Sequence, residues 1–250
     1  MSVKEISCQL KYLPHYKLTV PNITIHHATL VLRDSPLNQK PDLIYNCAMR
    51  TYRAVDLRVL WFLIALNVVI FAMEMAIGPY PIVQNGQVVN EVVLFLGLAR
   101  VVLPQQPWTI ITSMFVHGSI WHILFNMITL YFLGSFLIRA TGERSFLAVF
   151  FLGGLAGNVL YILLAPPNVI GIGASGGIFA LAGALAVIVP RVPVFIFFIP
   201  IPMPLWIAVI ILLAISFLFS GIAWQAHLGG LLLGLVAGFI FRRRRRTYFF

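Results

Sequence analysis

The chain has 250 residues, of which 60% are hydrophobic and only 10% are charged, and its mean hydropathy is +0.96. Soluble domains are about half apolar and about a quarter charged, so this composition excludes a soluble globule and predicts a membrane protein with several spanning helices. The formal net charge is +10. The run Arg242–Arg246 directly follows an apolar segment, however, which indicates contact with anionic lipid rather than with nucleic acid.

Residues 1–57 are polar, and no run among them is apolar enough to span a bilayer. They lack the pattern of a secretory signal, and the segments 18–20 and 23–25 alternate like short strands. We expect neither a disulfide framework nor a metal site here, because the spacings match no metal-ligand pair. The residues considered for zinc are Cys8, His15, His26, His27 and Cys47.

Six later segments are apolar enough to be spanning helices, and a proline-containing segment, 78–118, separates the first two. The apolar stretch 92–102 within that segment is too short to span, so we expect an interfacial or partly inserted loop. A proline cluster after residue 189 ends the fourth segment. The six predicted spans are 58–77, 119–138, 145–164, 175–189, 204–220 and 225–241.

The basic residues predict how these spans cross the membrane. With six spans both tails share one side, and that side holds 16 of the 17 Lys and Arg residues: eight up to Arg58, then Arg139, Arg144, Arg191 and the five at 242–246. Only Arg100 falls on the other side. Because cytoplasmic segments are enriched in Lys and Arg, we expect both termini to be cytoplasmic.

Polar residues recur in the first turns of the second, fourth and sixth spans, which all enter from the outer face. They are His117, His122 and Asn126, then Ser175, then His227. Polar groups at such depth are costly unless they pair or line water, so they usually mark function. His122 and Asn126 are four residues apart, so together they can bind one oxygen, although hydrogen bonding between helices is an alternative role.

Ser175 lies within the sequence Gly-Ile-Gly-Ala-Ser-Gly-Gly at 171–177 and begins an apolar run. A hydroxyl there sits beside free backbone N–H groups and the positive end of a helix dipole, which can hold a developing oxyanion. Small-residue packing or helix capping is the simpler interpretation of the same residues.

Two stripes of small residues favour contact between the fourth and sixth spans. Both repeat every four residues, the pattern of closely packed membrane helices. If the stripes face each other, His227 approaches Ser175 as a general base approaches its nucleophile. The stripes are Gly176, Ala180 and Ala184 in the fourth span and Gly230, Gly234 and Gly238 in the sixth.

In combination these motifs resemble the rhomboid family of intramembrane serine proteases over about residues 55–245. The motifs are His117-x4-His122-x3-Asn126, Gly173-Ala174-Ser175-Gly176 and Ala226-His227. The resemblance implies an all-α membrane protein with a six-transmembrane-helix rhomboid-like bundle at 58–241. A small N-terminal cytoplasmic segment, 1–57, precedes the bundle, and a basic C-terminal tail, 242–250, follows it.

The resemblance also implies residue roles, without a cofactor or a metal. Ser175 would be the nucleophile and His227 the base of a dyad. His122, Asn126 and the backbone N–H of Ser175 would form the oxyanion hole, supported by His117, Gly173 and Phe179. Substrates would be single-span membrane proteins in the bilayer, cut near the outer membrane boundary, and the location would be the plasma (inner) membrane of a prokaryote.

Two positions depart from the family pattern. Thr109 follows Trp108 where many members have arginine, and Phe179 replaces a common tyrosine. Phe179 retains the ability to stack on His227 but not to donate a hydroxyl hydrogen bond. The alternative function is that of a catalytically silent relative that binds and routes membrane proteins. A transporter is disfavoured because the chain's halves show no repeat.

Overall fold

The computed structural model describes residues 4–9, 46–51, 55–77, 82–84, 87–196, 199–219 and 221–247. The chain divides into two compact units, Met1–Val55 and Asp56–Phe250. In the first unit, strands β1 (Lys4–Gln9) and β2 (Asn46–Thr51) pair antiparallel, with Cys8 opposite Cys47. The strands expected over 18–20 and 23–25, and the three histidines of residues 1–57, lie outside the described residues.

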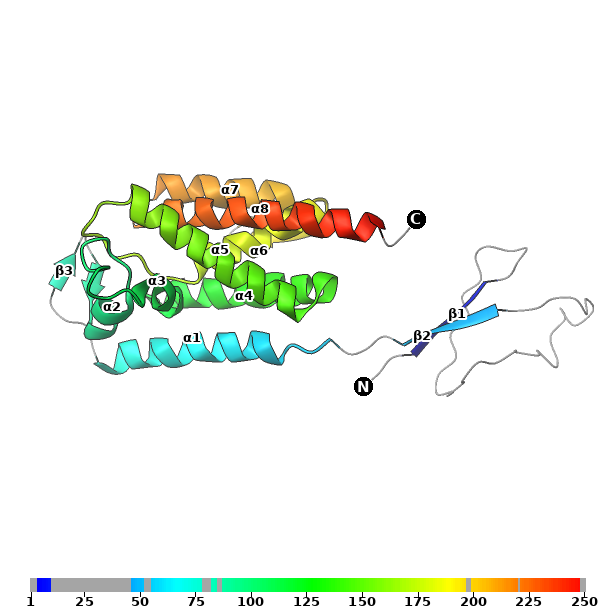
Figure 1. Ribbon diagram of the computed structural model, residues 1–250, viewed down its shortest axis with the longest axis horizontal. Helices are drawn as coiled ribbons and strands as arrows, with labels where there is room; N and C mark the ends of the chain where they lie inside the picture. The colour runs from blue at the N-terminus through cyan, green and yellow to red at the C-terminus, as the bar shows by residue number, and fades with distance from the viewer. Residues whose placement is uncertain are drawn as a thin grey trace, which may run out of the picture. The chain divides into compact units, whose positions relative to one another are not determined.

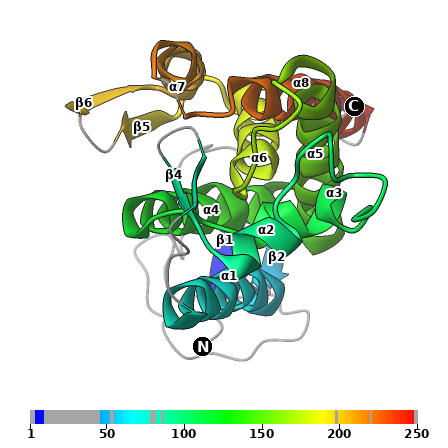
Figure 2. The same ribbon diagram turned by 90° about the vertical axis from the view of Figure 1, so that its left-hand side faces the viewer.

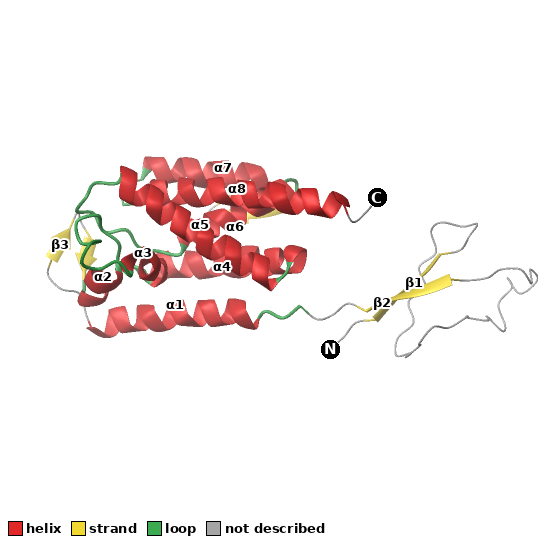
Figure 3. Ribbon diagram, in the orientation of Figure 1, coloured by secondary structure: helices red, strands yellow, loops and turns green. Residues whose placement is uncertain are grey.

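Within the described residues, six apolar helices build the second unit and run roughly along one direction (Figure 1), so the predicted class of helical membrane protein is confirmed. In the part of the chain that the structure describes, four of these helices are long and apolar enough to cross a membrane, whereas α6 and α7 have 14 residues each. Figure 3 shows their helical course. The helices are α1 (Arg58–Ile77), α4 (Ile120–Thr141), α5 (Glu143–Leu164), α6 (Ser175–Ile188), α7 (Leu205–Leu218) and α8 (Trp224–Thr247).

Helix α8 extends six residues beyond the predicted end of the last span and includes the arginine run up to Thr247. Arginine is a good helix former, and positive charge is favourable at a helix C-terminus, where unpaired carbonyls leave a partial negative charge. The end of the apolar run therefore does not end the helix.

The segment between α1 and α4 forms short elements that gather at one end of the bundle (Figure 1). Helix α2 (Glu91–Leu96) is capped by Asn90, whose side chain accepts from the Val93 N–H. As expected, 92–102 forms no spanning helix. The other elements of this segment are β3 (Ile82–Gln84), β4 (Gln87–Val89), α3 (Thr109–Thr112) and η1 (Ser113–Phe115). An antiparallel hairpin of β5 (Pro193–Ile196) and β6 (Ile199–Pro204) links α6 to α7.

Helix α6 occupies the centre of the bundle, with α4, α5, α7 and α8 around it (Figure 2). Glycines of α8 face its small residues: a Cβ on Gly230 would overlap the carbonyl oxygen of Gly176, and a Cβ on Gly234 would overlap that of Ala180. Since a side chain cannot fit at these positions, the two backbones approach as closely as small-residue stripes allow.

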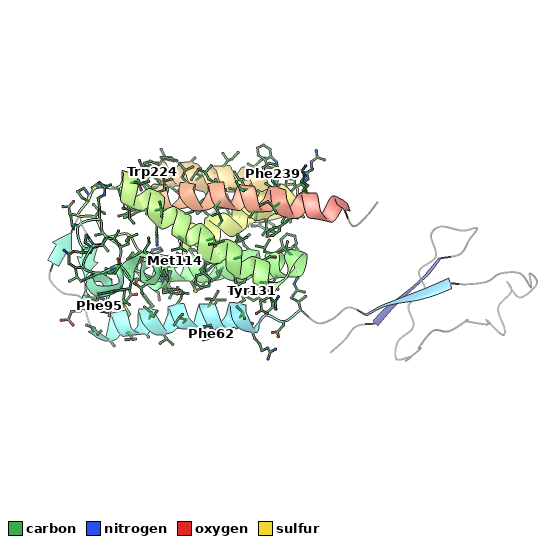
Figure 4. The ribbon with its side chains drawn as sticks, viewed as in Figure 1. Phe62, Phe95, Met114, Tyr131, Trp224 and Phe239 are labelled. Atoms are coloured by element: carbon green, nitrogen blue, oxygen red, sulfur yellow. The ribbon has the colours of Figure 1, made fainter. Side chains whose placement is uncertain are left out.

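Apolar side chains also cover the outside of the bundle (Figure 4). Phe62 of α1 and Phe239 of α8 point outward and are 66% and 62% exposed, whereas Met114 lies inside at 1%. Large exposed apolar surface is expected where lipid replaces water as the solvent. The protein is therefore an integral membrane protein.

Candidate active site

Ser175 is the first residue of α6 and is half-buried. Its N–H belongs to the first turn of the helix, where backbone donors have no intrahelical acceptor. The chain reaches Ser175 through Gly173, whose φ of +119° is a conformation that L side chains rarely adopt. The N–H of Gly173 donates to the carbonyl oxygen of Ser113, 2.8 Å away, which fixes this turn against η1.

The structure brings Ser175 and His227 together, with the Ser175 Oγ 2.8 Å from the His227 Nε2. His227 lies in the first turn of α8, and its ring is buried. Three residues further along, Gly230 packs against the backbone of Gly176, which fixes the separation of the two helices at this level. A serine hydroxyl that donates to an unprotonated imidazole can act as a nucleophile, because the imidazole can take its proton.

Two further side chains hold the imidazole of His227. The ring of Phe179 stacks on it, with centroids 4.3 Å apart and planes 17° apart. The Oγ of Ser216, on α7, lies 2.7 Å from the His227 Nδ1. The resemblance to the family pointed to Phe179, whereas Ser216 was missed. Nothing in an isolated serine of an apolar helix reveals a contact with another helix.

His122 of α4 lies near the serine, and Asn126 is one turn further along the same helix. A Cβ on Gly173 would be 2.7 Å from the His122 Nε2 and 3.6 Å from the Ser175 Oγ, so the missing side chain leaves room between the two. The Asn126 side chain donates one N–H to the His122 carbonyl oxygen at 2.8 Å and keeps a second N–H. The His122 ring therefore borders the space beside Ser175.

His117 precedes α4 and is completely buried. Burial, with a smaller contribution from His122, lowers the pKa of His117 to about 3, so the ring is neutral at ordinary pH. Its backbone N–H donates to Glu74 Oε1 at 3.0 Å, and its ring meets that of His122 edge-on at 4.9 Å. These contacts suit a residue that supports His122.

The loop before α4 is anchored although Thr109 replaces the family's arginine. The indole of Trp108 donates to the Phe95 carbonyl oxygen at 2.9 Å. Arg100 donates to the carbonyl oxygen of Ile162 at 2.6 Å, and its second contact, to Ala165 at 3.0 Å, lies at the end of α5. Arg100, which the sequence marked only as the single outer basic residue, thus ties the loop to α5.

The same loop reaches the serine turn directly. Leu98 and Gly171 exchange two backbone hydrogen bonds, of 3.0 and 2.8 Å. Asn158 of α5 donates to the Ile110 carbonyl oxygen and to the Ser113 Oγ, at 2.7 and 3.0 Å. The position of Ser175 therefore depends on contacts from α5 and from the loop as well as on α6.

An apolar helical bundle with a serine hydrogen-bonded to a buried histidine has the arrangement of a membrane-embedded serine hydrolase. The chain belongs to the rhomboid family: residues 104–244 match the model of the Rhomboid domain. The family is one of intramembrane proteases that act on transmembrane substrates within the bilayer.

Named relatives agree with this assignment. "RHOMBOID-like protein 12, mitochondrial" of Arabidopsis thaliana is 33% identical over 55% of this chain and 47% of its own length. "Putative rhomboid protease YdcA" of Bacillus subtilis (strain 168) is 30% identical over 56% of this chain and 71% of its own. "Rhomboid protein 1, mitochondrial" of Saccharomyces cerevisiae is 28% identical, and the chain spans only 40% of it. The chain thus spans less than half the length of these plant and yeast relatives.

Proposed function

We propose that the chain is an intramembrane serine endopeptidase that cleaves single-span membrane proteins near the outer membrane boundary. Ser175 is its nucleophile and His227 its general base. The observation that carries this proposal is the 2.8 Å contact between the Ser175 Oγ and the His227 Nε2.

The chemistry proceeds in two stages. His227 takes the proton of Ser175 while the oxygen attacks the scissile carbonyl, and the tetrahedral intermediate collapses when His227 gives this proton to the leaving amine. The resulting acyl-enzyme is then hydrolysed by a water that His227 deprotonates, which restores Ser175.

The developing oxyanion needs donors that are in place before the reaction. The N–H of Ser175, the free N–H of the Asn126 side chain and the His122 Nε2 are assigned this role. The observation that supports this assignment is the space that Gly173 leaves between His122 and Ser175. Preorganised donors of this kind contribute strongly in a site that excludes bulk water.

The length of α6 favours a cut near the outer boundary. Its 14 residues span about 21 Å, whereas the hydrocarbon core is about 30 Å thick. If α6 reaches the inner boundary, Ser175 is recessed by several Å from the outer one. A peptide bond in a regular helix is inaccessible to it, so the substrate must unwind locally. We expect helix breakers after the cut, and the resemblance adds a small residue before it.

The proposed orientation in the membrane rests on the distribution of positive charge. Arg100 is the only Lys or Arg expected on the outer side, so both termini belong on the cytoplasmic side. We propose the plasma membrane of a prokaryote as the compartment.

The direct test is cleavage of a single-span reporter by the purified protein in liposomes, with the cut mapped by mass spectrometry. The proposal predicts a cut near the outer boundary that is lost in Ser175→Ala, and slower cleavage when leucine replaces the helix breakers. Reporter that binds but stays intact with the wild-type protein would instead support the silent, substrate-routing function.

A further inference from the structure

Ser216 connects the histidine of the candidate site to α7, a helix that contributes none of the residues named so far for catalysis. The side chain is buried, with 3% exposed. Its Oγ has two partners: the His227 Nδ1 at 2.7 Å and the carbonyl oxygen of Leu212, one turn earlier on α7, at 2.9 Å.

The chemistry of these groups fixes the direction of each hydrogen bond. A carbonyl oxygen only accepts, so the single proton of the Ser216 hydroxyl is donated to Leu212. The Ser216 oxygen is left with its lone pairs, and it accepts from the His227 Nδ1. In a neutral imidazole one nitrogen carries the proton and the other accepts. Nδ1 is therefore the protonated nitrogen and Nε2 the acceptor.

We infer that Ser216 is a positioning residue that sets the tautomer of His227, so that the lone pair of Nε2 faces the Ser175 hydroxyl. This inference rests on the proposed function, because the tautomer matters only if His227 is a base. One directed chain results, running from the Ser175 hydroxyl through His227 and Ser216 to the Leu212 carbonyl oxygen.

Phe179 and Ser216 have different tasks at the same ring. Stacking on Phe179 holds the plane of the imidazole, but a stacked ring is held equally well in either tautomer. The hydrogen bond at Nδ1 distinguishes the tautomers, since the partner of one ring nitrogen decides which nitrogen is protonated. Ser216 also opposes a flip of the ring, which would move Nε2 away from Ser175.

A hydroxyl performs this task differently from the carboxylate of a Ser-His-Asp triad. The carboxylate orients the imidazole and also stabilises the imidazolium by its charge. Ser216 is neutral and supplies orientation and a dipole. Its removal should therefore cost about tenfold in kcat, the effect of one ordinary hydrogen bond, rather than the loss of about 10⁴ seen when a triad aspartate is altered.

The kinetic test compares three substitutions at Ser216 with a matched control. Ser145 is the control, because it also donates to the carbonyl oxygen four residues earlier, at 3.0 Å, but lies on α5 away from the histidine. Ser216→Ala should lower kcat for the reporter about tenfold and leave KM unchanged. Ser216→Thr, which keeps the oxygen, should restore kcat, and Ser145→Ala should match wild type. Unchanged kcat in Ser216→Ala would overturn the inference.

A spectroscopic test reads the tautomer without any catalysis. In protein labelled with ¹⁵N-histidine and carrying Ser175→Ala, the His227 signals are assigned by comparison with His227→Gln. The inference predicts protonated Nδ1 with Ser216 present and a shift toward protonated Nε2 in the Ser175→Ala/Ser216→Ala variant. A tautomer that is the same with and without Ser216 would contradict it.

The two tests separate failure of the inference from failure of the proposed function. If the wild-type protein cleaves no reporter, the proposed function fails, while the tautomer measurement still decides whether Ser216 orients His227. Should Ser216→Ala not fold, the near-isosteric Ser216→Cys replaces it. Sulfur is a weak acceptor, so a reduced kcat is expected, and a kcat equal to wild type would overturn the inference.

Discussion

Gly173 and His122 are so close that a Cβ on the glycine would lie 2.7 Å from the Nε2 of the histidine. The glycine also has a φ of +119°, which disfavours any side chain at this position. Two separate constraints therefore require glycine: the backbone turn that leads into Ser175 and the open space beside His122. The second constraint is the one that we connect with oxyanion binding.

The two constraints can be separated by two alanine substitutions. Gly142→Ala serves as the control, because Gly142 has a φ of +90° with nothing within 4 Å of its Cβ position. Both variants should lose stability, on the order of 1–3 kcal/mol. Only Gly173→Ala should also lose cleavage of the reporter. Equal activity of the two folded variants would show that the space beside His122 has no role in catalysis.

Asn126→Ala should slow kcat by about 10²–10³, the usual effect of removing one oxyanion donor. Asn67→Ala is the matched control, since Asn67 donates to the Leu63 carbonyl oxygen at 2.7 Å, just as Asn126 donates to His122 at 2.8 Å. The control should lower the unfolding temperature and leave kcat unchanged. His122→Ala should behave like Asn126→Ala. If Asn126→Ala changes only stability, the alternative role in hydrogen bonding between helices is supported.

His117 should make the folded protein less stable in acid. The pKa of His117 is lowered to about 3, against about 6.5 in an unfolded chain. Between these values the unfolded state binds a proton that the folded state does not, so stability falls as the pH drops from about 6.5 toward 3. The charged and titratable groups beside it are Glu74 and His122.

The measurement is the unfolding temperature in detergent as a function of pH, for wild type and His117→Phe. The difference between the two curves isolates the contribution of His117 to acid stability from that of the other histidines. The variant should lose less stability than wild type between pH 6.5 and pH 4. Parallel curves would mean that the folded protein binds a proton at His117 as readily as the unfolded chain does.

The helices were predictable because each depends on an uninterrupted apolar run, which is a local property of the sequence. The segments at 58–77 and 175–189 match α1 and α6 almost to the residue. Ser216 and Arg100 were not predictable as partners of His227 and Ile162. Their contacts join residues that are distant in sequence, and neither side chain has a periodicity or motif that indicates a partner.

The positions of the basic residues predict the topology. A reporter fused after Arg246 should lie in the cytoplasm, and one inserted at Gln87, between α1 and α2, should lie outside. The reason is that all but one of the 17 Lys and Arg residues fall on one side of a six-span arrangement. The check is reporter activity in intact cells. Finding both reporters on the same side would contradict the six-span arrangement.

The most direct test of the central claim, that His227 activates Ser175, is covalent labelling of the purified protein with a fluorophosphonate and location of the adduct by mass spectrometry. The wild-type protein should form a bond between Ser175 Oγ and phosphorus, with loss of fluoride. His227→Ala should react more slowly by about 10²–10⁴, the usual contribution of a general base. An unlabelled Ser175 in folded wild-type protein, or equal labelling of His227→Ala, would contradict the account.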